Sequence, residues 1–249
     1  MIKAFSKTID YYDKSRPSYP AELFNFLEKK FDADGAHVIA DIGSGTGIFT
    51  KLLLDRGHHV ISVEPNDEMR KIAEENLAHY PFYKSVAASA ESTRLEESSV
   101  DMITAATAFH WFSPELAKCE FKRILKLGGI CVLAWNVRDK TFPIMQDYES
   151  MMRHFVSDYE KVVGSHYSSE DVIIDFFNPN EIDTIELPNI QPLDLVGFQG
   201  RILSTSYSPK PGDSNYKELL IASEDLFNKY KSSNKVNLYY RCKCYAGKL

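Results

Sequence analysis

The stretch VIADIGSGTGIFTKLL, residues 38–53, governs the interpretation of the whole chain. A short apolar run, typical of a buried strand, ends at Ile42 and is followed by Gly43, Gly45 and Gly47. The spacing of apolar residues after the last glycine predicts a helix. A strand, a glycine-rich turn and a helix in this order are typical of the first unit of a parallel α/β sheet, where the bare backbone of the turn can contact a ligand. A purely structural turn is the alternative.

Strand and helix patterns alternate through the first half of the chain. We expect strands at 38–40, 59–65, 82–89, 100–109 and 130–135, separated by helices at 48–55, 66–77 and 113–129. A further amphipathic helix at 21–31 precedes the first strand. Because parallel strands need helical crossovers between them, this alternation predicts a doubly wound, mostly parallel α/β sheet.

The alternation stops after Trp135. Residues 140–182 are aromatic and polar and predict short helices, and 216–230 predicts an amphipathic helix. Strand patterns return at 181–189 and 235–247. These two strands bring the predicted sheet to seven.

The composition limits the classes of partner. The 249 residues carry a formal net charge of −6; 44% are hydrophobic and 26% are charged, as in an ordinary globular protein. A mildly acidic chain without a block of Lys and Arg is a poor match to a nucleic-acid backbone, and no apolar run approaches the roughly 18 residues of a membrane span. We therefore expect neither nucleic acid nor a membrane as a partner, and the residues indicate no particular oligomeric state.

The cysteines and the first residues bear on the cellular compartment. Cys242 and Cys244 alternate along a predicted strand and would share one of its faces. Without a second cysteine pair or paired histidines, reduced buried thiols are expected rather than a metal site. The first six residues show no apolar signal segment, so the expected location is the cytoplasm.

Acidic residues after the strands point to a nucleoside cofactor. Glu64 ends the second strand about 20 residues past the glycine turn, where a carboxylate can accept both ribose hydroxyls of NAD or of S-adenosylmethionine; a solvated acid is the alternative. Asp41 places a carboxylate where a cationic amino group can sit, and NAD has no such group. Ala90 and Glu91 follow the third strand, where they can meet an adenine edge. These features favour S-adenosylmethionine, with an NAD-dependent oxidoreductase as the alternative.

Five motifs resemble a known family. VIADIGSGTGIFT, VISVEPNDEMR, ASAESTRL, VDMITAATAFHWF and RILKLGGICVLAW follow one another as in the class I S-adenosylmethionine-dependent methyltransferases, type 11 small-molecule group. The stretches YYDKSRPSYP and FQGRILSTSYSP resemble a narrower subgroup that includes trans-aconitate methyltransferase-like proteins. The chain departs from the pattern at Leu127, where a proline is usual, and at Thr107, where the subgroup often has glutamine. The resemblance implies a Rossmann-like fold with a helical insertion before the last strands, and S-adenosylmethionine as cofactor.

We accordingly predict a single methyltransferase domain over residues 1–249. Its expected parts are an N-terminal lid and first helix (1–36), a cofactor-binding core (37–136), a helical insertion (137–182), and the closing strands and helix (183–249).

The resemblance also assigns roles to individual residues. The methionine part of the cofactor is expected on Asp41, Gly43, Ser44, Gly45, Thr46 and Gly47; the ribose on Glu64 beside Pro65; the adenine on Met69, Ala90 and Glu91; the sulfonium above Ala106 and Thr107; and a lid at Tyr12 and Arg16. For Met69 the alternative is ordinary helix core, and for Arg16 a surface side chain.

The acceptor site is less specified. His110 is the one candidate base next to the expected methyl position, and the alternative is that it shapes the pocket wall together with Trp111. Arg201 and Tyr207 are expected to line the acceptor site, where Arg201 meets an anion or else forms a structural ion pair. The predicted function is methyl transfer to a small organic acceptor, with a carboxylate favoured by analogy. A non-catalytic S-adenosylmethionine-binding sensor or subunit remains the alternative from another class.

Overall fold

The computed structural model describes residues 15–31, 37–164 and 169–249, which belong to two compact units. The sheet unit consists of Tyr19–Trp135, His166–Leu187 and Cys242–Leu249, and the helical unit of Met1–Ser18, Asn136–Ser165 and Pro188–Arg241, each in its described part. The predicted insertion at 137–182 is divided between the two units. The prediction of a single domain with four parts stays a prediction.

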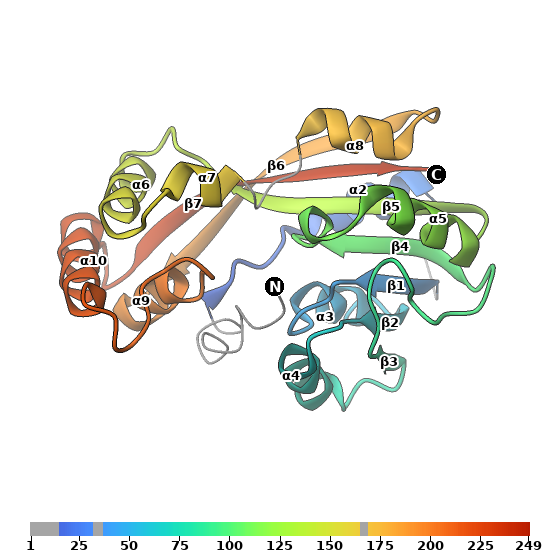
Figure 1. The fold of residues 1–249 in the computed structure, drawn as a ribbon, viewed down its shortest axis with the longest axis horizontal. Helices are drawn as coiled ribbons and strands as arrows, with labels where there is room; N and C mark the ends of the chain where they lie inside the picture. Colours follow the sequence, from blue (N-terminus) through green and yellow to red (C-terminus); the bar gives the residue numbers. More distant parts are fainter. Residues whose placement is uncertain (1–14, 32–36, 165–168) are drawn as a thin grey trace. The chain divides into compact units, whose positions relative to one another are not determined.

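Helices and strands alternate through the sheet unit (Figure 1). In chain order its elements are α2 (Ala21–Phe31), β1 (Val38–Ile42), α3 (Ile48–Leu54), β2 (His59–Val63), α4 (Asp67–Leu77), β3 (Tyr83–Val86), β4 (Val100–Ala106), the 3-10 helix η2 (Phe109–Trp111), α5 (Pro114–Ile124) and α8 (Glu170–Phe177). The helical unit contains α6 (Pro143–Phe155), α7 (Tyr159–Gly164), α9 (Leu195–Leu203) and α10 (Tyr216–Tyr230). Three long strands contribute residues to both units: β5 (Leu125–Arg138), β6 (Ile182–Leu193) and β7 (Val236–Gly247).

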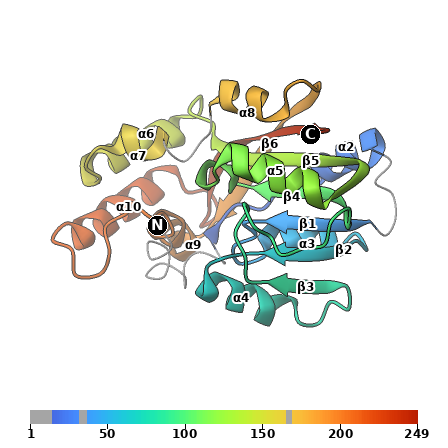
Figure 2. The same cartoon turned by 45° about the vertical axis from the view of Figure 1, so that its right-hand side comes forward.

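The seven strands form one sheet in the order β3-β2-β1-β4-β5-β7-β6. The pairs β1–β2, β1–β4, β2–β3 and β4–β5 are parallel, and Figure 2 shows β1 next to β2 at the centre of this arrangement. The doubly wound α/β class is therefore confirmed. The order reverses at β1, between β2 and β4, and ligands of such sheets bind beyond the carboxyl ends of the strands at this reversal. The glycine turn after β1 lies at that point.

One face of the sheet unit is covered by α2, α3 and α4. Leu23, Phe49 and Leu77 from these helices share a buried apolar cluster with Ile39 of β1 and Met102 of β4. Ile39 and Met102 are register partners, so the cluster crosses adjacent strands on one face. Burial of these side chains is the main stabilising contribution, at about 25 cal/mol per Å² of apolar surface removed from water.

Most predicted elements are present, and α10 matches its predicted range. The predicted helix at 113–129 was too long, because α5 ends at Ile124 and Leu125 already pairs with Val100 in the sheet. The sheet partner, which lies far away in sequence, overrides the local helical pattern. Helix α9 was not predicted; the Asp194 side chain accepts a hydrogen bond from Gly197 N at 2.8 Å and caps its first turn.

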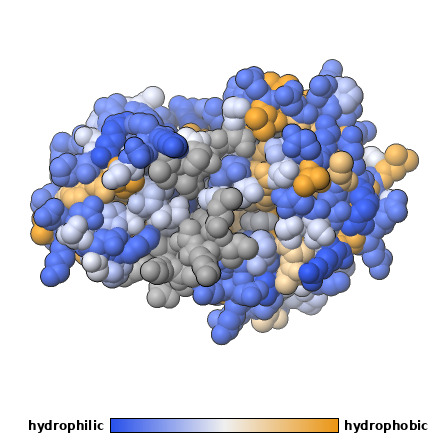
Figure 3. All heavy atoms as spheres, in the orientation of Figure 1, coloured by the Kyte–Doolittle hydropathy of each residue, from blue (hydrophilic) through white to orange (hydrophobic). Residues whose placement is uncertain are grey.

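The described part of the chain contains no helix with the length and apolar character needed to cross a membrane. The face drawn in Figure 3 is mainly hydrophilic, and its hydrophobic side chains gather only in small groups.

Candidate functional site

The turn after β1 is shaped by close packing. Gly47 adopts φ = 85°, and a Cβ added there would lie 2.7 Å from Leu77 Cδ1. A larger residue would therefore separate α3 from α4. Gly45 is different, because an added Cβ would meet only Met69 Sδ, at 3.9 Å. Gly45 is thus the position of the turn where the missing side chain leaves space.

Within the turn, the backbone amides have hydrogen-bond partners in the described protein, whereas two side-chain hydroxyls do not. The amides of Gly43, Ser44, Gly45 and Gly47 all donate to acceptors within the protein. The side-chain oxygens Ser44 Oγ and Thr46 Oγ1 are buried, and no described residue forms a hydrogen bond with them. Buried polar atoms are normally satisfied. These two hydroxyls therefore suit a polar ligand in the turn, as the sequence predicted for the methionine part of the cofactor.

Glu64 connects the ends of β1 and β2. It is buried, its Oε2 accepts from Gly45 N at 2.9 Å, and its Oε1 accepts from Asn66 N at 2.8 Å. Burial raises the pKa of its carboxyl above the ordinary value, and the two backbone donors oppose that rise. A carboxylate oxygen accepts more than one hydrogen bond, so capacity for the predicted ribose hydroxyls is left. The alternative of a solvated acid is wrong.

Asp41, at the end of β1, is fully buried. Its Oδ2 accepts from Thr50 Oγ1 at 2.6 Å, and its Oδ1 accepts from Thr104 Oγ1 at 2.8 Å. Burial raises the pKa of Asp41 to about 6, while the two threonine hydroxyls lower it. Both oxygens are thus held by neutral donors, and the predicted cationic partner would add the positive charge that this site lacks.

The residues predicted to contact the adenine lie at the start of α4 and after β3. Met69 is buried on α4, and the N-cap residue Asn66 accepts hydrogen bonds from Glu68 N and Met69 N. Pro65 is exposed and Ala90 is buried. Glu91 Oε1 accepts from Ser113 N at 2.9 Å, so this acid holds the residue before α5. The adenine contact of Glu91 stays a prediction.

The end of β4 is conformationally strained. Thr107 has φ = 54°, which is unfavourable for a β-branched residue. Its amide donates to Ala134 O at 2.7 Å, and its Oγ1 lies 2.9 Å from Tyr19 Oη. Such strain clusters at ligand sites. The half-buried Ala106 and Thr107 therefore remain candidates for the floor beneath the reacting group.

His110 and Trp111 lie in the short helix η2 that follows β4. Trp135 Nε1 of β5 donates to His110 Nδ1 over 3.5 Å, and Trp111 is partly exposed. Because the indole is only a donor, this contact requires an unprotonated Nδ1 and assigns the proton of a neutral imidazole to Nε2. His110 is thereby set to donate from Nε2, which favours the pocket-wall interpretation over the base.

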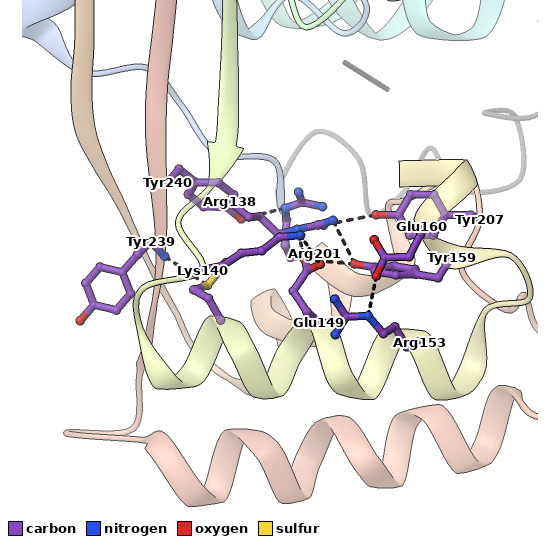
Figure 4. Close-up of polar contacts among 11 residues, drawn as sticks. Arg138, Lys140, Glu149, Arg153, Tyr159, Glu160, Arg201, Tyr207, Tyr239 and Tyr240 are labelled. Carbon is purple, nitrogen blue, oxygen red and sulfur yellow. Dashed lines mark hydrogen bonds and ion pairs between the residues drawn. The ribbon is translucent and has the colours of Figure 1, made fainter. Parts of the chain in front are cut away.

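The remaining predicted residues belong to the helical unit. Tyr12 lies outside the described residues. Arg16 donates from a terminal nitrogen to Ser204 O at 2.8 Å, and its place in a lid over the cofactor stays a prediction. Arg201 is buried and donates to Tyr240 Oη at 3.1 Å (Figure 4). None of the described carboxylates pairs with Arg201, so the predicted structural ion pair is wrong for this part of the chain.

Several residues of these sites were not predicted. Thr104 and Tyr19 support Asp41 and Thr107 from positions far away in sequence, and Thr50 supports Asp41 from α3, nine residues along the chain. A threonine within the apolar strand VDMITAA was the one visible signal, since a buried hydroxyl needs a partner. Among the described residues, no group of three His, Cys, Asp or Glu side chains is arranged to hold a metal ion.

Comparison with known proteins agrees with this geometry. Residues 40–133 match a sequence model described as a methyltransferase domain. An uncharacterized methyltransferase-like protein of Schizosaccharomyces pombe is 31% identical over 164 residues, which cover 66% of this chain and 63% of that protein. The chain spans 63% of the length of that relative and 55% of the length of an uncharacterized methyltransferase of Mycobacterium bovis, which is 35% identical over 140 residues.

Solved structures show the same fold. A candidate type II methyltransferase from Anaeromyxobacter dehalogenans superimposes with a TM-score of 0.65 at 20% identity, over 94% of this chain and 97% of that chain. A methyltransferase from Geobacter sulfurreducens, solved in complex with S-adenosyl-L-homocysteine, gives a TM-score of 0.55 at 15% identity, over 98% of this chain and 97% of that chain.

Proposed function

We propose that this chain is a class I S-adenosylmethionine-dependent methyltransferase that transfers a methyl group from that cofactor to a small organic acceptor; the match of residues 40–133 to a methyltransferase domain and the likeness to a methyltransferase-like relative support this. The observation that carries the proposal is the pair of buried hydroxyls of Ser44 and Thr46, which form no hydrogen bond with the described residues, beside the open position at Gly45. A polar ligand in this turn would satisfy both. The narrower likeness to the trans-aconitate methyltransferase-like subgroup stays a prediction.

The residues of the sheet unit fit the proposed cofactor. Glu64 would accept the ribose hydroxyls with its remaining lone pairs, Ser44 and Thr46 would bind the polar methionine part, and Met69 would contact the adenine. Asp41 supplies a buried negative charge for a cationic group. When bound, S-adenosylmethionine supplies a methyl group on a positively charged sulfur, which makes the methyl carbon electrophilic.

The protein's own contribution is to orient the acceptor and to exclude water. His110 would donate a hydrogen bond from Nε2 to an acceptor oxygen, because Trp135 occupies Nδ1. Such a donor suits an oxygen that already carries negative charge, as a carboxylate does. A carboxylate acceptor arrives already deprotonated, so its methylation needs no base.

The sequence leaves two alternatives to this function. The NAD-dependent oxidoreductase is disfavoured by the methyltransferase domain at 40–133. A non-catalytic S-adenosylmethionine-binding sensor would use the same turn and the same Glu64. Turnover with a panel of acceptors separates a sensor from an enzyme, because only an enzyme produces S-adenosylhomocysteine in step with acceptor loss.

Calorimetry with S-adenosylhomocysteine and with NADH tests the cofactor. We expect binding of S-adenosylhomocysteine and none of NADH. Tight NADH binding without any response to S-adenosylhomocysteine would overturn the proposal. A cytoplasmic location, with neither nucleic acid nor a membrane as partner, is part of the same proposal; four free cysteines and the net charge of −6 support it.

A further inference from the structure

The helical unit contains a buried group of ionic and phenolic side chains (Figure 4). Arg138 comes from β5, Glu149 from α6, Arg201 from α9 and Tyr240 from β7. All four are less than a tenth exposed. Charged side chains are seldom buried without a partner of opposite charge. An excess of positive charge in this group would therefore indicate an anionic ligand.

Glu149 neutralises Arg138. Arg138 Nε lies 2.6 Å from Glu149 Oε1, and Tyr159 Oη donates to the same oxygen at 3.1 Å. The other oxygen, Oε2, lies 3.1 Å from Nζ of Lys140, whose side chain is half exposed. Both oxygens of this carboxylate are thus engaged, and none of its charge is left for a second buried cation.

Arg201 is that second cation. It is 6% exposed, and its hydrogen-bond partners among the described residues are neutral: Tyr240 Oη at 3.1 Å and Ser204 Oγ at 3.4 Å. The Tyr240 ring, 5.9 Å from the guanidinium carbon, adds only a weak attraction. No described carboxylate forms an ion pair with Arg201. The group thus contains one buried positive charge without a counter-charge, an arrangement that is unfavourable until an anion joins it.

Tyr148 provides an independent sign of a missing partner. This α6 residue is 1% exposed, and its hydroxyl forms no hydrogen bond with the described residues. The Arg138 guanidinium lies 5.4 Å from its ring centre. Burial raises the pKa of Tyr148 to about 12, against the opposing charges of Arg201 and Arg138, so the hydroxyl keeps its proton at neutral pH. A buried O–H donor beside a cation without a counter-charge suits an anionic oxygen.

We propose that Arg201 and Tyr148 form a binding site for one carboxylate group of a small organic molecule. The guanidinium supplies the charge, and the Tyr148 hydroxyl donates a hydrogen bond to a carboxylate oxygen. One uncompensated positive charge matches a carboxylate better than a phosphate, which carries about −1.5 to −2 at neutral pH. That this molecule is the methyl acceptor rests on the proposed function; the binding site itself does not.

Two phenylalanine variants form a matched pair. Tyr148→Phe removes a hydroxyl that has no hydrogen-bond partner among the described residues, so the ligand-free variant should be at least as stable as the ligand-free wild type. Tyr240→Phe removes a hydroxyl that accepts from Arg201 and donates to Gln191, so the same measurement should show a loss of stability. If Tyr148→Phe destabilises the ligand-free protein as much as Tyr240→Phe does, its hydroxyl has an internal partner and the proposal fails.

Binding is measured by calorimetry with benzoate, succinate and glutarate, each against its neutral amide. We expect at least one acid to bind the wild type at least about tenfold more tightly than its amide. Tyr148→Phe should lower the affinity for that acid about tenfold. Arg201→Met keeps the volume but removes the charge, and should abolish the preference for the acid. Equal affinity for acids and amides, or no binding of any acid, overturns the proposal.

A titration with S-adenosylhomocysteine on the same proteins separates the two proposals. Loss of acid binding in Tyr148→Phe with S-adenosylhomocysteine binding intact supports the carboxylate site alone. Should the wild type fail to bind S-adenosylhomocysteine while the acid preference holds, the proposed function falls and the carboxylate site stands.

Discussion

Glu64 Oε2 accepts a hydrogen bond from Gly45 N at 2.9 Å, so the acid that ends β2 holds the turn that follows β1. The same carboxylate accepts from Asn66 N with its other oxygen. Glu64 therefore has a structural role in addition to the proposed binding of ribose. Its replacement should lower both the stability of the protein and the affinity for the cofactor.

Glu64→Gln tests this double role. The amide nitrogen of glutamine cannot accept a hydrogen bond, so one of the two backbone donors loses its partner, at a cost of about 1–3 kcal/mol in the free energy of unfolding. We expect the fold to survive and the affinity for S-adenosylhomocysteine to fall at least tenfold by calorimetry. Glu68→Gln, at an exposed acid on the next helix, is the control and should change neither quantity. Unchanged affinity in Glu64→Gln would contradict the ribose assignment.

Asp41 predicts a dependence of stability on pH. Burial raises its pKa from the ordinary value of 3.8 to about 6. The folded state thus holds the proton more tightly than the unfolded state, and the stabilisation from protonated Asp41 is complete below about pH 4 and lost as the pH rises through 6. Relative to Asp41→Asn, which does not titrate, the wild type should lose on the order of 3 kcal/mol between pH 4 and 7.

Denaturant unfolding of both proteins across that pH range measures the difference. Binding of S-adenosylhomocysteine, whose amino group is cationic, should strengthen over the same range in the wild type alone, because the ionised Asp41 attracts it. A constant stability difference between the two proteins would show that Asp41 keeps its ordinary pKa.

Thr107 allows backbone strain and hydrogen bonding to be separated. Both Thr107→Ala and Thr107→Gly lose the contact with Tyr19, but only glycine adopts φ = 54° without strain. Thr107→Gly should therefore be more stable than Thr107→Ala by about 1 kcal/mol, as measured by urea unfolding. Equal stabilities, or the opposite order, would contradict a strained conformation at this position.

The contact between Trp135 and His110 predicts the imidazole tautomer. Nitrogen NMR of neutral His110 should show the proton on Nε2, and Trp135→Phe should allow both tautomers. His110→Asn should lose less than about tenfold in turnover, because removal of a true base costs about 10²–10⁴. A thousandfold loss with cofactor binding intact, together with a pH–rate limb that disappears in the variant, would identify His110 as a base.

The sequence alone determined the fold class and the main elements of the candidate site. The alternation of strands and helices is a local pattern, and each glycine of the turn lies a few residues from the strand it follows. Glu64 was predictable for the same reason, since the carboxyl ends of neighbouring parallel strands meet at one edge of the sheet. The Asn66 cap is also local, because its side chain accepts from Glu68 N and Met69 N in the first turn of α4.

Only the tertiary structure decided which partners these residues have. Thr104 holds Asp41, Tyr19 contacts Thr107, and Ser113 binds Glu91 across long separations in sequence. The end of α5 was likewise set by pairing of Leu125 with Val100 rather than by local pattern.

The charge balance around Arg201 is the feature that the sequence predicts least. Its surroundings come from β5, α6, α9 and β7, and local periodicity does not specify how four such elements meet. Whether a buried arginine has a counter-charge depends on the position of one carboxylate, and Glu149 lies against Arg138 instead. The residue types were visible in the sequence, but their pairing is a property of packing, because ionic contacts act over a few ångströms in space and are indifferent to separation along the chain.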